Sequence, residues 1–470
     1  MASSRKPLSP VDAGWFHMDS DTNLAMVTGV TLTREPLDFA QVKAVYEHRI
    51  ATLPRFRQRV VETGFPVPSP HWEDDPLFNI DDHIHHVALP EPCDQQALMH
   101  FLSDLASTPL DYKRPLWQVH VVDRVNGGSA VALRFHHCIG DGTAMMAIAQ
   151  RLFDTEPDAP PDKVAPLARP PKAGLFDQVV RPVQQSGQLL GDLIQGGLDM
   201  VMHPSHAFDL SALAVRSAGV AVGTLLKWPD PATPLKGKLS IGKRVAWSEP
   251  VALGDVKEIG RLAGAKVNDV LVTAMAGALR HYMQGREATV DGVTIRAVVP
   301  VDLRPPDRAL ELGNHFGLTF LDMPVGISGP LERLQATKSK MDAIKQSPEA
   351  FVFMNLIGFF GLTPKPVEDL ALMIFGSKAS LVFTNVAGPR TTLYMAGRAV
   401  ERLIFWVPHP ANLGMGIAIF SYNDKVTVGI VADAGLVPDP ETIAVEFDRE
   451  FARLLEAVRP PNGDAEPGPT

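Results

Sequence analysis

The chain has 470 residues, of which 45% are hydrophobic and 21% are charged, and its formal net charge is −9 at pH 7. This length exceeds what one ordinary hydrophobic core supports, so we expect two lobes of a globular protein. The acidic balance leaves no global basic field to hold nucleic acid, which disfavours that class of partner.

Strands and helices are mixed in the first predicted lobe, residues 1–155. Alternating apolar residues predict a strand at 24–34, and helical spacing predicts a helix at 38–53. Residues 115–137 predict a β-hairpin, because two β-rich runs flank the turn residues Asn126-Gly127-Gly128. A further helix is predicted at 143–154.

The composition changes at residues 156–235. Proline and alanine are frequent in 154–174, which predicts an extended linker, and apolar stripes predict two crossover helices at 176–201 and 207–227. A second lobe follows at 236–459, and the tail at 460–470 is predicted to be disordered. The second lobe has predicted strands at 239–251, 294–304, 379–389 and 414–433 and predicted helices at 267–283, 332–346 and 440–458.

Three observations bear on the compartment. The two cysteines, Cys93 and Cys138, are too few for a disulfide framework, which favours a reducing compartment. Residues 1–16 lack the apolar run of a signal peptide, and no stretch of about 18 apolar residues predicts a spanning helix. The most apolar stretch, 351–362, fits either a buried core helix or contact with a membrane surface. We therefore expect a cytoplasmic protein.

Two histidines end the second strand of the predicted hairpin. Alternation places His137 on the apolar face with the alternate residues from Val131 to Phe135, and places His136 and Cys138 on the opposite side. An imidazole in an apolar cavity stays neutral, because desolvation disfavours its charged form, and it can then take a proton from a hydroxyl. The alternative for His137 is a core histidine without a catalytic role.

A sharp turn with an acidic residue follows the histidines. Gly140 and Gly142 allow close backbone approach on either side of Asp141. An unpaired buried carboxylate is too unfavourable, so Asp141 is predicted to be either the N-cap of the next helix or one half of a buried ion pair.

The segment 136–142, HHCIGDG, resembles the HHxxxDG motif of bacterial wax ester synthase/acyl-CoA:diacylglycerol acyltransferases, members of the chloramphenicol acetyltransferase-like superfamily. Condensation domains carry the same motif, so the other matching segments narrow the choice. The resemblance runs from about residue 8 to about residue 458, and its further segments are 8–23, 115–117, 268–269, 299–305, 384–389 and 421–424.

The resemblance implies an α+β fold of two chloramphenicol-acetyltransferase-like lobes, with mixed, mainly antiparallel sheets, flanking helices and a tunnel between the lobes. It implies an acyl-CoA-dependent O-acyltransferase that esterifies diacylglycerol, a long-chain alcohol or both, without an acyl-enzyme. Acyl-CoA is then the co-substrate, and no cofactor or metal is expected. Lipid substrates imply peripheral attachment to a membrane or to lipid inclusions.

The resemblance also implies roles for single residues. His137 is the general base, His136 supports it, and Asp141 is structural and pairs with Arg304 of the second lobe. Asn268 is either a polar contact in the tunnel, such as an oxyanion donor, or an ordinary helix cap. The substrate contacts implied are Gly140, Gly142 and Asp269.

Two other readings of the whole chain stay open. One is a condensation-type or small-alcohol acyltransferase, and the other is a lipid-binding protein that uses the same tunnel without catalysis. Intact His137, Gly140 and Asp141 argue against the second.

Two further clusters of polar residues have both a structural and a functional interpretation. Residues 81–86, DDHIHH, lack a second group with metal-ligand spacing, so we predict a solvated edge strand. The densest basic run fits either the entrance for anionic CoA or ordinary solvated surface. Separately, Trp117 is predicted to be a packing residue under the histidine strand. The basic run consists of Lys236, Lys238, Lys243 and Arg244.

Overall fold

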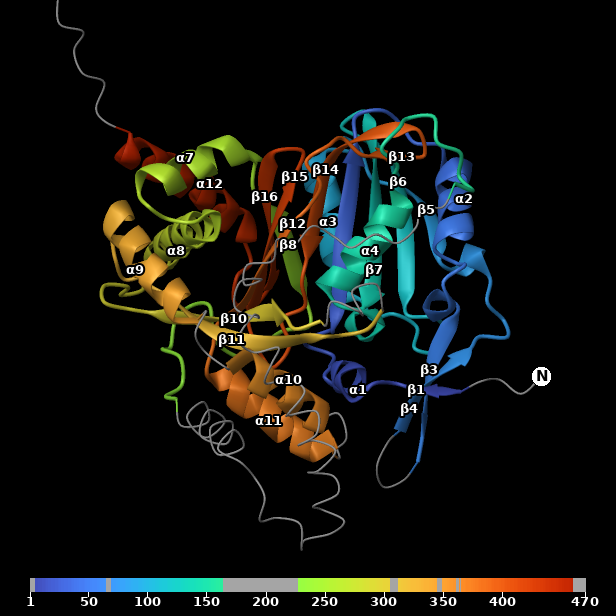
Figure 1. Cartoon of the computed structure of the whole chain (residues 1–470), viewed down its shortest axis with the longest axis horizontal. Coiled ribbons are helices and arrows are strands. Elements are labelled where there is room, and N and C mark those ends of the chain that lie inside the picture. The colour runs from blue at the N-terminus through green and yellow to red at the C-terminus, as the bar shows by residue number, and fades with distance from the viewer. Residues whose placement is uncertain are drawn as a thin grey trace, which may run out of the picture.

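The computed structural model describes residues 5–64, 69–163, 227–304, 312–344, 349–360, 363 and 365–459. The predicted crossover helices and the predicted tail lie outside the described residues. Two large sheets stand side by side, each with helices on its outer side (Figure 1). This is the α+β, two-lobe architecture that the sequence predicts.

The first lobe is built on a six-stranded sheet in the order β13-β14-β2-β7-β6-β5. Only the β5–β6 pair is parallel. Its strands are β2 (Met26–Thr33), β5 (Ile84–Ala88), β6 (Trp117–Val125), β7 (Gly128–His136), β13 (Tyr394–Met395) and β14 (Arg398–Trp406), and the helices of this part of the chain are α1 (Pro10–His17), α2 (Phe39–Arg49), α3 (Gln95–Ser107) and α4 (Gly142–Leu152). A small sheet of β1 (Lys6–Pro7), β4 (Ser69–Asp74) and β3 (Gln58–Thr63) lies beside α1.

The second lobe is built on a seven-stranded mixed sheet in the order β11-β10-β12-β15-β16-β8, with β9 paired to β16. The pairs β10–β12 and β12–β15 are parallel. Its strands are β8 (Lys243–Trp247), β9 (Val251–Ala252), β10 (Ile295–Asp302), β11 (Phe316–Met323), β12 (Leu381–Ala387), β15 (Met415–Tyr422) and β16 (Lys425–Asp433). Its helices are α7 (Leu253–Leu262), α8 (Val267–Gly285), α9 (Pro330–Ile344), α10 (Glu349–Phe360), α11 (Lys365–Ser377) and α12 (Pro440–Val458).

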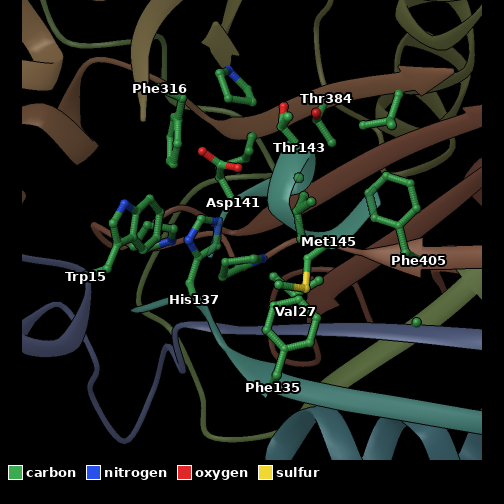
Figure 2. Close-up of a pocket in the computed structure, with 18 of the residues that line it drawn as sticks. Trp15, Val27, Phe135, His137, Asp141, Thr143, Met145, Phe316, Thr384 and Phe405 are labelled. Carbon is green, nitrogen blue, oxygen red and sulfur yellow. The ribbon is translucent and has the colours of Figure 1, made fainter. Parts of the chain in front are cut away.

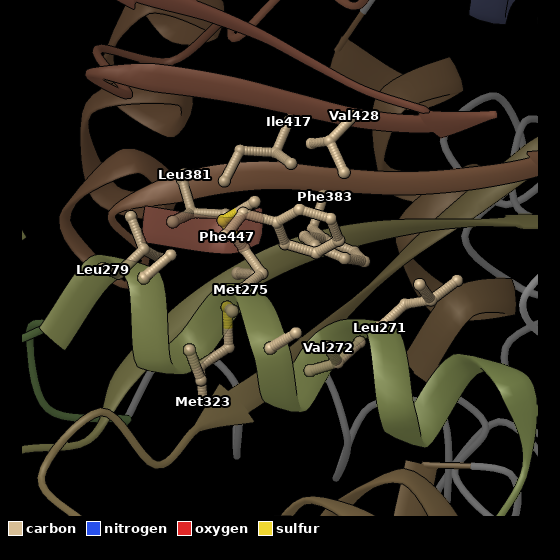
Figure 3. Close-up of a cluster of buried hydrophobic side chains, with 14 of the residues drawn as sticks. Leu271, Val272, Met275, Leu279, Met323, Leu381, Phe383, Ile417, Val428 and Phe447 are labelled. Carbon is tan, nitrogen blue, oxygen red and sulfur yellow. The ribbon is translucent and has the colours of Figure 1, made fainter. Parts of the chain in front are cut away.

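The largest core cluster lies between this sheet and helix α8 (Figure 3). Leu271, Met275 and Leu279 recur at helical spacing and face Phe383 of the sheet and Phe447 of α12. Burying side chains of this size contributes about 1.5–3 kcal/mol each. This core holds the second lobe rigid behind the strand ends that carry the site.

The predicted hairpin is confirmed by β6 and β7. Asn126 and Gly127 have φ values of +48° and +87°, the left-handed conformation that a tight hairpin turn requires. The predicted strands at 24–34, 294–304, 379–389 and 414–433 and the predicted helices at 38–53, 143–154, 267–283, 332–346 and 440–458 are also present.

One strand crosses between the lobes. β14 belongs by sequence to residues 236–459, yet it pairs antiparallel with β2 of the first lobe, from Val400 opposite Thr33 to Trp406 opposite Thr28. The division at 236–459 did not foresee this exchange. β14 covers the edge of β2, so the first sheet depends on a strand from the second half of the chain to pair that edge.

The edge-strand prediction for residues 81–86 holds only in part. β5 is the last strand of its sheet, and His86 is exposed and hydrogen-bonds to Asp123. His83, however, is buried: its Nδ1 donates to the carbonyl of Trp117 at 2.8 Å, and its ring stacks on the Trp117 indole at 4.5 Å. The prediction of a solvated histidine there was wrong, because the turn before β5 rotates His83 onto a fully buried tryptophan.

Helix α10 covers most of the apolar stretch 351–362. It packs against α1 and β11, and its described side chains Phe353 and Ile357 are buried, which favours the core reading for them. Within the described ranges, no single helix is long and apolar enough to cross a membrane, although α7 and α8, bent by 99°, meet the length and composition criteria together.

Candidate active site

A cavity of about 430 Å³ lies between the lobes. Elements β2, β7 and α4 line it from the first lobe, and β10, β11, β12, α10 and α11 line it from the second. Most of the lining side chains are apolar, and its size falls in the range of ligand-binding cavities. The space therefore suits a substrate with long hydrocarbon chains.

His137 stands in the wall of this cavity, immediately after β7 (Figure 2). Val131, Leu133 and Phe135 line the same cavity, which agrees with the alternation predicted along the strand. His136 points the other way and is fully buried, with Nε2 3.6 Å from the carboxylate of Asp19. The strand thus presents one imidazole to the cavity and keeps the other behind it.

The ring of His137 is held by aromatic contacts. It stacks on the Trp15 indole with centroids 4.0 Å apart and planes 16° from parallel, and Phe316 lies 5.6 Å away (Figure 2). Its Nδ1 has no hydrogen-bond partner among the described residues. Burial lowers the pKa of His137 to about 4, because desolvation of the imidazolium outweighs the opposing pull of the Asp141 carboxylate. The imidazole is neutral at pH 7 and able to accept a proton.

Asp141 and Arg304 form a buried ion pair across the lobes. Arg304 Nη2 lies 2.7 Å from each carboxylate oxygen of Asp141 and also donates to the carbonyl of Gly313 at 2.9 Å. Asp141 is at the same time the N-cap of α4 and accepts from the backbone N–H of Ala144. Both roles that the sequence left open are therefore present at one residue.

A second tie holds the backbone of His137. The Asn314 side-chain amide donates to the carbonyl of His137 and to the carboxylate of Asp12, each at 2.8 Å. The backbone N–H of His137 donates to the carbonyl of Ala25 at 2.8 Å. Asn314 follows Gly313, whose φ of +118° and closeness to the Asp12 carboxylate favour glycine. Residues from both lobes thus fix the position of the imidazole.

The two motif glycines have different surroundings. A Cβ on Gly140 would lie 2.8 Å from the Cβ of Ala144, so this position requires glycine for packing, and Gly140 is not among the residues that line the cavity. Gly142 lines the cavity, and a Cβ there would approach only Val386, at 3.9 Å. Only Gly142 is placed for the substrate contact that the resemblance implies.

Asn268 and Asp269 open helix α8. Asp269 is buried and accepts from the backbone N–H of Lys266 at 2.8 Å, which makes it a capping residue rather than part of the cavity wall. Asn268 Oδ1 accepts from the amide of Asn385 at 2.7 Å, and it is Asn385 that lines the cavity. Neither Asn268 nor Asp269 is among the residues that line the cavity, where Asn385 of β12 stands instead.

Several residues of the cavity wall were not predicted. Trp15 lies in segment 8–23, and the family resemblance of that segment was the one sequence signal that could have pointed to it. Thr143 donates to Asp302 at 3.0 Å, and both line the cavity. Glu368 of α11 also lines it. Asp302 lies in segment 299–305, which also carries the resemblance, whereas Glu368 lies in no segment that indicates a cavity position.

The four residues of the basic run do not form one basic surface. Lys243 is buried against Asp433 at 2.8 Å, and Lys236 donates to the backbone carbonyls of Gly376, Ser377 and Ala379. Lys238 and Arg244 are exposed. Among the residues that the structure describes, no group of three or more His, Cys, Asp or Glu side chains could hold a metal ion.

Two family models match the chain. The model described as the wax ester synthase/diacylglycerol acyltransferase catalytic domain matches residues 8–271, and the WS/DGAT C-terminal domain matches 312–455. The chain belongs to the wax ester synthase/diacylglycerol acyltransferase family. As a member, it is an acyltransferase, and the motif resemblance at residues 136–142 is confirmed at the level of the family.

One relative is similar to this chain in sequence, and two solved structures are similar to it in fold. "Probable diacyglycerol O-acyltransferase tgs1" of Mycobacterium tuberculosis is 27% identical over 465 residues, covering 95% of each chain. The solved wax ester synthase/diacylglycerol acyltransferase of Marinobacter aquaeolei covers 96% of this chain and 100% of its own, with 21% identity and a TM-score of 0.67. The first condensation domain of the calcium-dependent antibiotic synthetase, at 16% identity, 97% coverage of each chain and a TM-score of 0.63, shares the fold.

The buried pair yields a prediction about stability. Arg304→Met leaves Asp141 charged and buried, so we expect a loss of about 3–5 kcal/mol in the free energy of unfolding, and Asp141→Asn should also destabilise. The double variant should lose less than the sum of the two single losses, because it leaves no unpaired charge. Urea unfolding measures all four proteins. Additive losses, or a loss below about 1 kcal/mol for Arg304→Met, would contradict a coupled buried pair.

Proposed function

We propose that this protein is an acyl-CoA-dependent O-acyltransferase that esterifies diacylglycerol, and also long-chain alcohols, with His137 as the general base. The observation that carries the proposal is a buried imidazole, stacked on Trp15, in the wall of an apolar cavity between two lobes. Its lowered pKa supports a neutral ring. Family membership supports acyl transfer, and the apolar wall supports lipid substrates.

The proposed reaction proceeds in one site without an acyl-enzyme. His137 takes the proton of the acceptor hydroxyl while the hydroxyl oxygen attacks the thioester carbonyl carbon of acyl-CoA. The tetrahedral intermediate collapses, the carbon–sulfur bond breaks, and the CoA thiolate receives the proton from His137. Holding both substrates in one cavity supplies much of the rate through proximity. No cofactor beyond the co-substrate acyl-CoA enters this scheme.

The polar groups of the wall have supporting roles in this proposal. Asn385, whose amide donates one N–H to Asn268 and keeps the other, is the uncharged donor of the cavity that we assign to a substrate oxygen. Thr143 donates its hydroxyl hydrogen to Asp302 and so positions that carboxyl in the cavity wall. Asn268 then acts through Asn385 and is a positioning residue. His136 supports His137 from behind the strand.

We also propose that the protein works at the surface of a membrane or lipid inclusion on the cytoplasmic side. Val367, Leu370 and Met373, spaced three residues apart on α11, are 45–56% exposed. The opposite face of the same helix, at Leu372 and Phe375, lines the cavity. A helix with both properties supports a short path for a lipid from the surface into the site.

The function is tested with purified protein, labelled palmitoyl-CoA and either diacylglycerol or hexadecanol. His137→Gln should lower ester formation about 10²–10⁴-fold with both acceptors, because the base is lost. His86→Gln, an exposed histidine, is the matched control and should keep wild-type activity. Ester formation that survives in His137→Gln would overturn the assignment of the base, and binding without turnover in the wild type would support a lipid carrier instead.

The lowered pKa of His137 predicts how kcat/KM changes with pH on the acid side. Only the neutral imidazole accepts a proton, so kcat/KM should stay level as the pH falls from 7 and should drop only as the pH approaches about 4, the pKa of His137. Steady-state rates between pH 4 and pH 8, with circular dichroism to show that the protein stays folded, measure this limb. A midpoint at the ordinary histidine pKa of about 6.5 would contradict a buried neutral base.

The lipid-surface proposal predicts a separable loss of binding. The triple variant Val367→Ser, Leu370→Ser and Met373→Ser should bind phosphatidylcholine vesicles containing diacylglycerol at least about tenfold more weakly, since each side chain gives up apolar burial. A matched triple serine variant at Leu77, Ile241 and Val445, which are exposed elsewhere, should bind as the wild type does. Equal vesicle flotation of the two triple variants would contradict the assignment of this face.

A further inference from the structure

Glu368 is a buried acid in the cavity that the proposed reaction does not use. It lies on α11 and lines the cavity, and only 1% of its surface is exposed. Among the residues that the structure describes, neither of its carboxyl oxygens has a hydrogen-bond partner. Buried polar groups are nearly always satisfied, so an unsatisfied carboxyl in a cavity wall points to a ligand as its partner.

The charged and titratable groups around Glu368 are engaged elsewhere. His17 of α1 is nearest, with Nδ1 3.6 Å away, but its Nε2 lies 2.9 Å from the carboxylate of Glu62 on β3. Lys365, on the same helix, donates to the carbonyl of His17 and pairs with Asp369. His17 Nδ1 is within ion-pair distance but beyond hydrogen-bond distance, so no described neighbour donates a hydrogen bond to the Glu368 carboxyl.

The carboxyl of Glu368 is mainly in its uncharged form at pH 7. Desolvation raises its pKa to about 8, against the weaker effect of Lys365. A protonated carboxyl carries one O–H donor, which a carboxylate lacks. The cavity thus offers a hydrogen-bond donor at a place separate from His137.

Charge at this end of the cavity distinguishes between the two substrates. Glu62 and Asp369 are exposed beside His17 and Lys365, so the local charge does not favour the phosphates of CoA. An uncharged lipid acceptor meets no such repulsion. Diacylglycerol carries two ester carbonyls in addition to its reactive hydroxyl, whereas a long-chain alcohol carries only the hydroxyl.

We propose that Glu368 recognises the acceptor by donating a hydrogen bond from its carboxyl to an ester carbonyl of diacylglycerol, which favours diacylglycerol over a long-chain alcohol. This inference rests on the proposed function and names the preferred acceptor. It also gives a reason for an otherwise unfavourable buried acid, since a binding group is often kept at the expense of stability.

The test compares Glu368→Leu and Glu368→Gln with the wild type, using palmitoyl-CoA with diacylglycerol or hexadecanol. For Glu368→Leu, kcat/KM with diacylglycerol should fall about tenfold or more, while the value with hexadecanol and the KM for palmitoyl-CoA should stay within about threefold. Glu368→Gln keeps a donor, so it should recover most of the diacylglycerol activity. Above pH 8 the wild type should lose diacylglycerol activity as its carboxyl ionises, and Glu368→Gln should not.

Controls separate recognition from folding. Glu368→Leu should have a thermal midpoint at or above that of the wild type, because a buried unpartnered polar group is removed. Glu456→Leu changes an exposed acid on α12, outside the cavity wall, and should leave the acceptor preference unchanged.

An equal loss with both acceptors, a changed KM for palmitoyl-CoA alone, or no change in Glu368→Leu would overturn the inference and leave the proposed function intact. A wild-type protein that forms no ester with either acceptor would overturn both.

Discussion

The buried ion pair between Asp141 and Arg304 is the interaction on which the site depends. One residue follows a strand of the first lobe and the other follows a strand of the second, so the pair fixes the turn that carries His137 relative to the opposite wall. Two charges in an apolar interior are tolerated only when each meets the other with good geometry. The amide of Asn314 adds an uncharged tie to the same turn, and the shared strand β14 couples the sheets.

The apolar cavity lowers the pKa of one titratable group and raises the pKa of another, and both shifts favour the uncharged form. Desolvation lowers the pKa of His137 and raises the pKa of Glu368, so both are uncharged at neutral pH. The first becomes a proton acceptor and the second a hydrogen-bond donor. Two uncharged groups suit the transfer of a fatty chain from an uncharged thioester to an uncharged alcohol. The apolar wall keeps the lipid chains in contact with apolar side chains.

The sequence predicts the parts of this site that lie within one element. Alternation along β7 separates His137 from His136, and the turn chemistry identifies the hairpin. Contacts between distant segments carry no local signal: Asn314 gives no sign that it meets His137, and the pattern at Asn268 predicts a helix start without showing that Asn385 stands between it and the cavity. Strand periodicity likewise does not tell which sheet β14 joins. The partner Arg304 was found through the family resemblance rather than through its local sequence.

The central claim is that His137 is uncharged inside the cavity, where it is able to deprotonate an alcohol. Protein labelled with ¹³C at histidine Cε1, with His137→Gln to assign the signal, reports the protonation of this ring directly by NMR titration. The account predicts that the His137 signal keeps its neutral shift down to about pH 5 and titrates with a pKa of about 4. A signal that titrates near pH 6.5, or one that is already that of an imidazolium at pH 7, would contradict it.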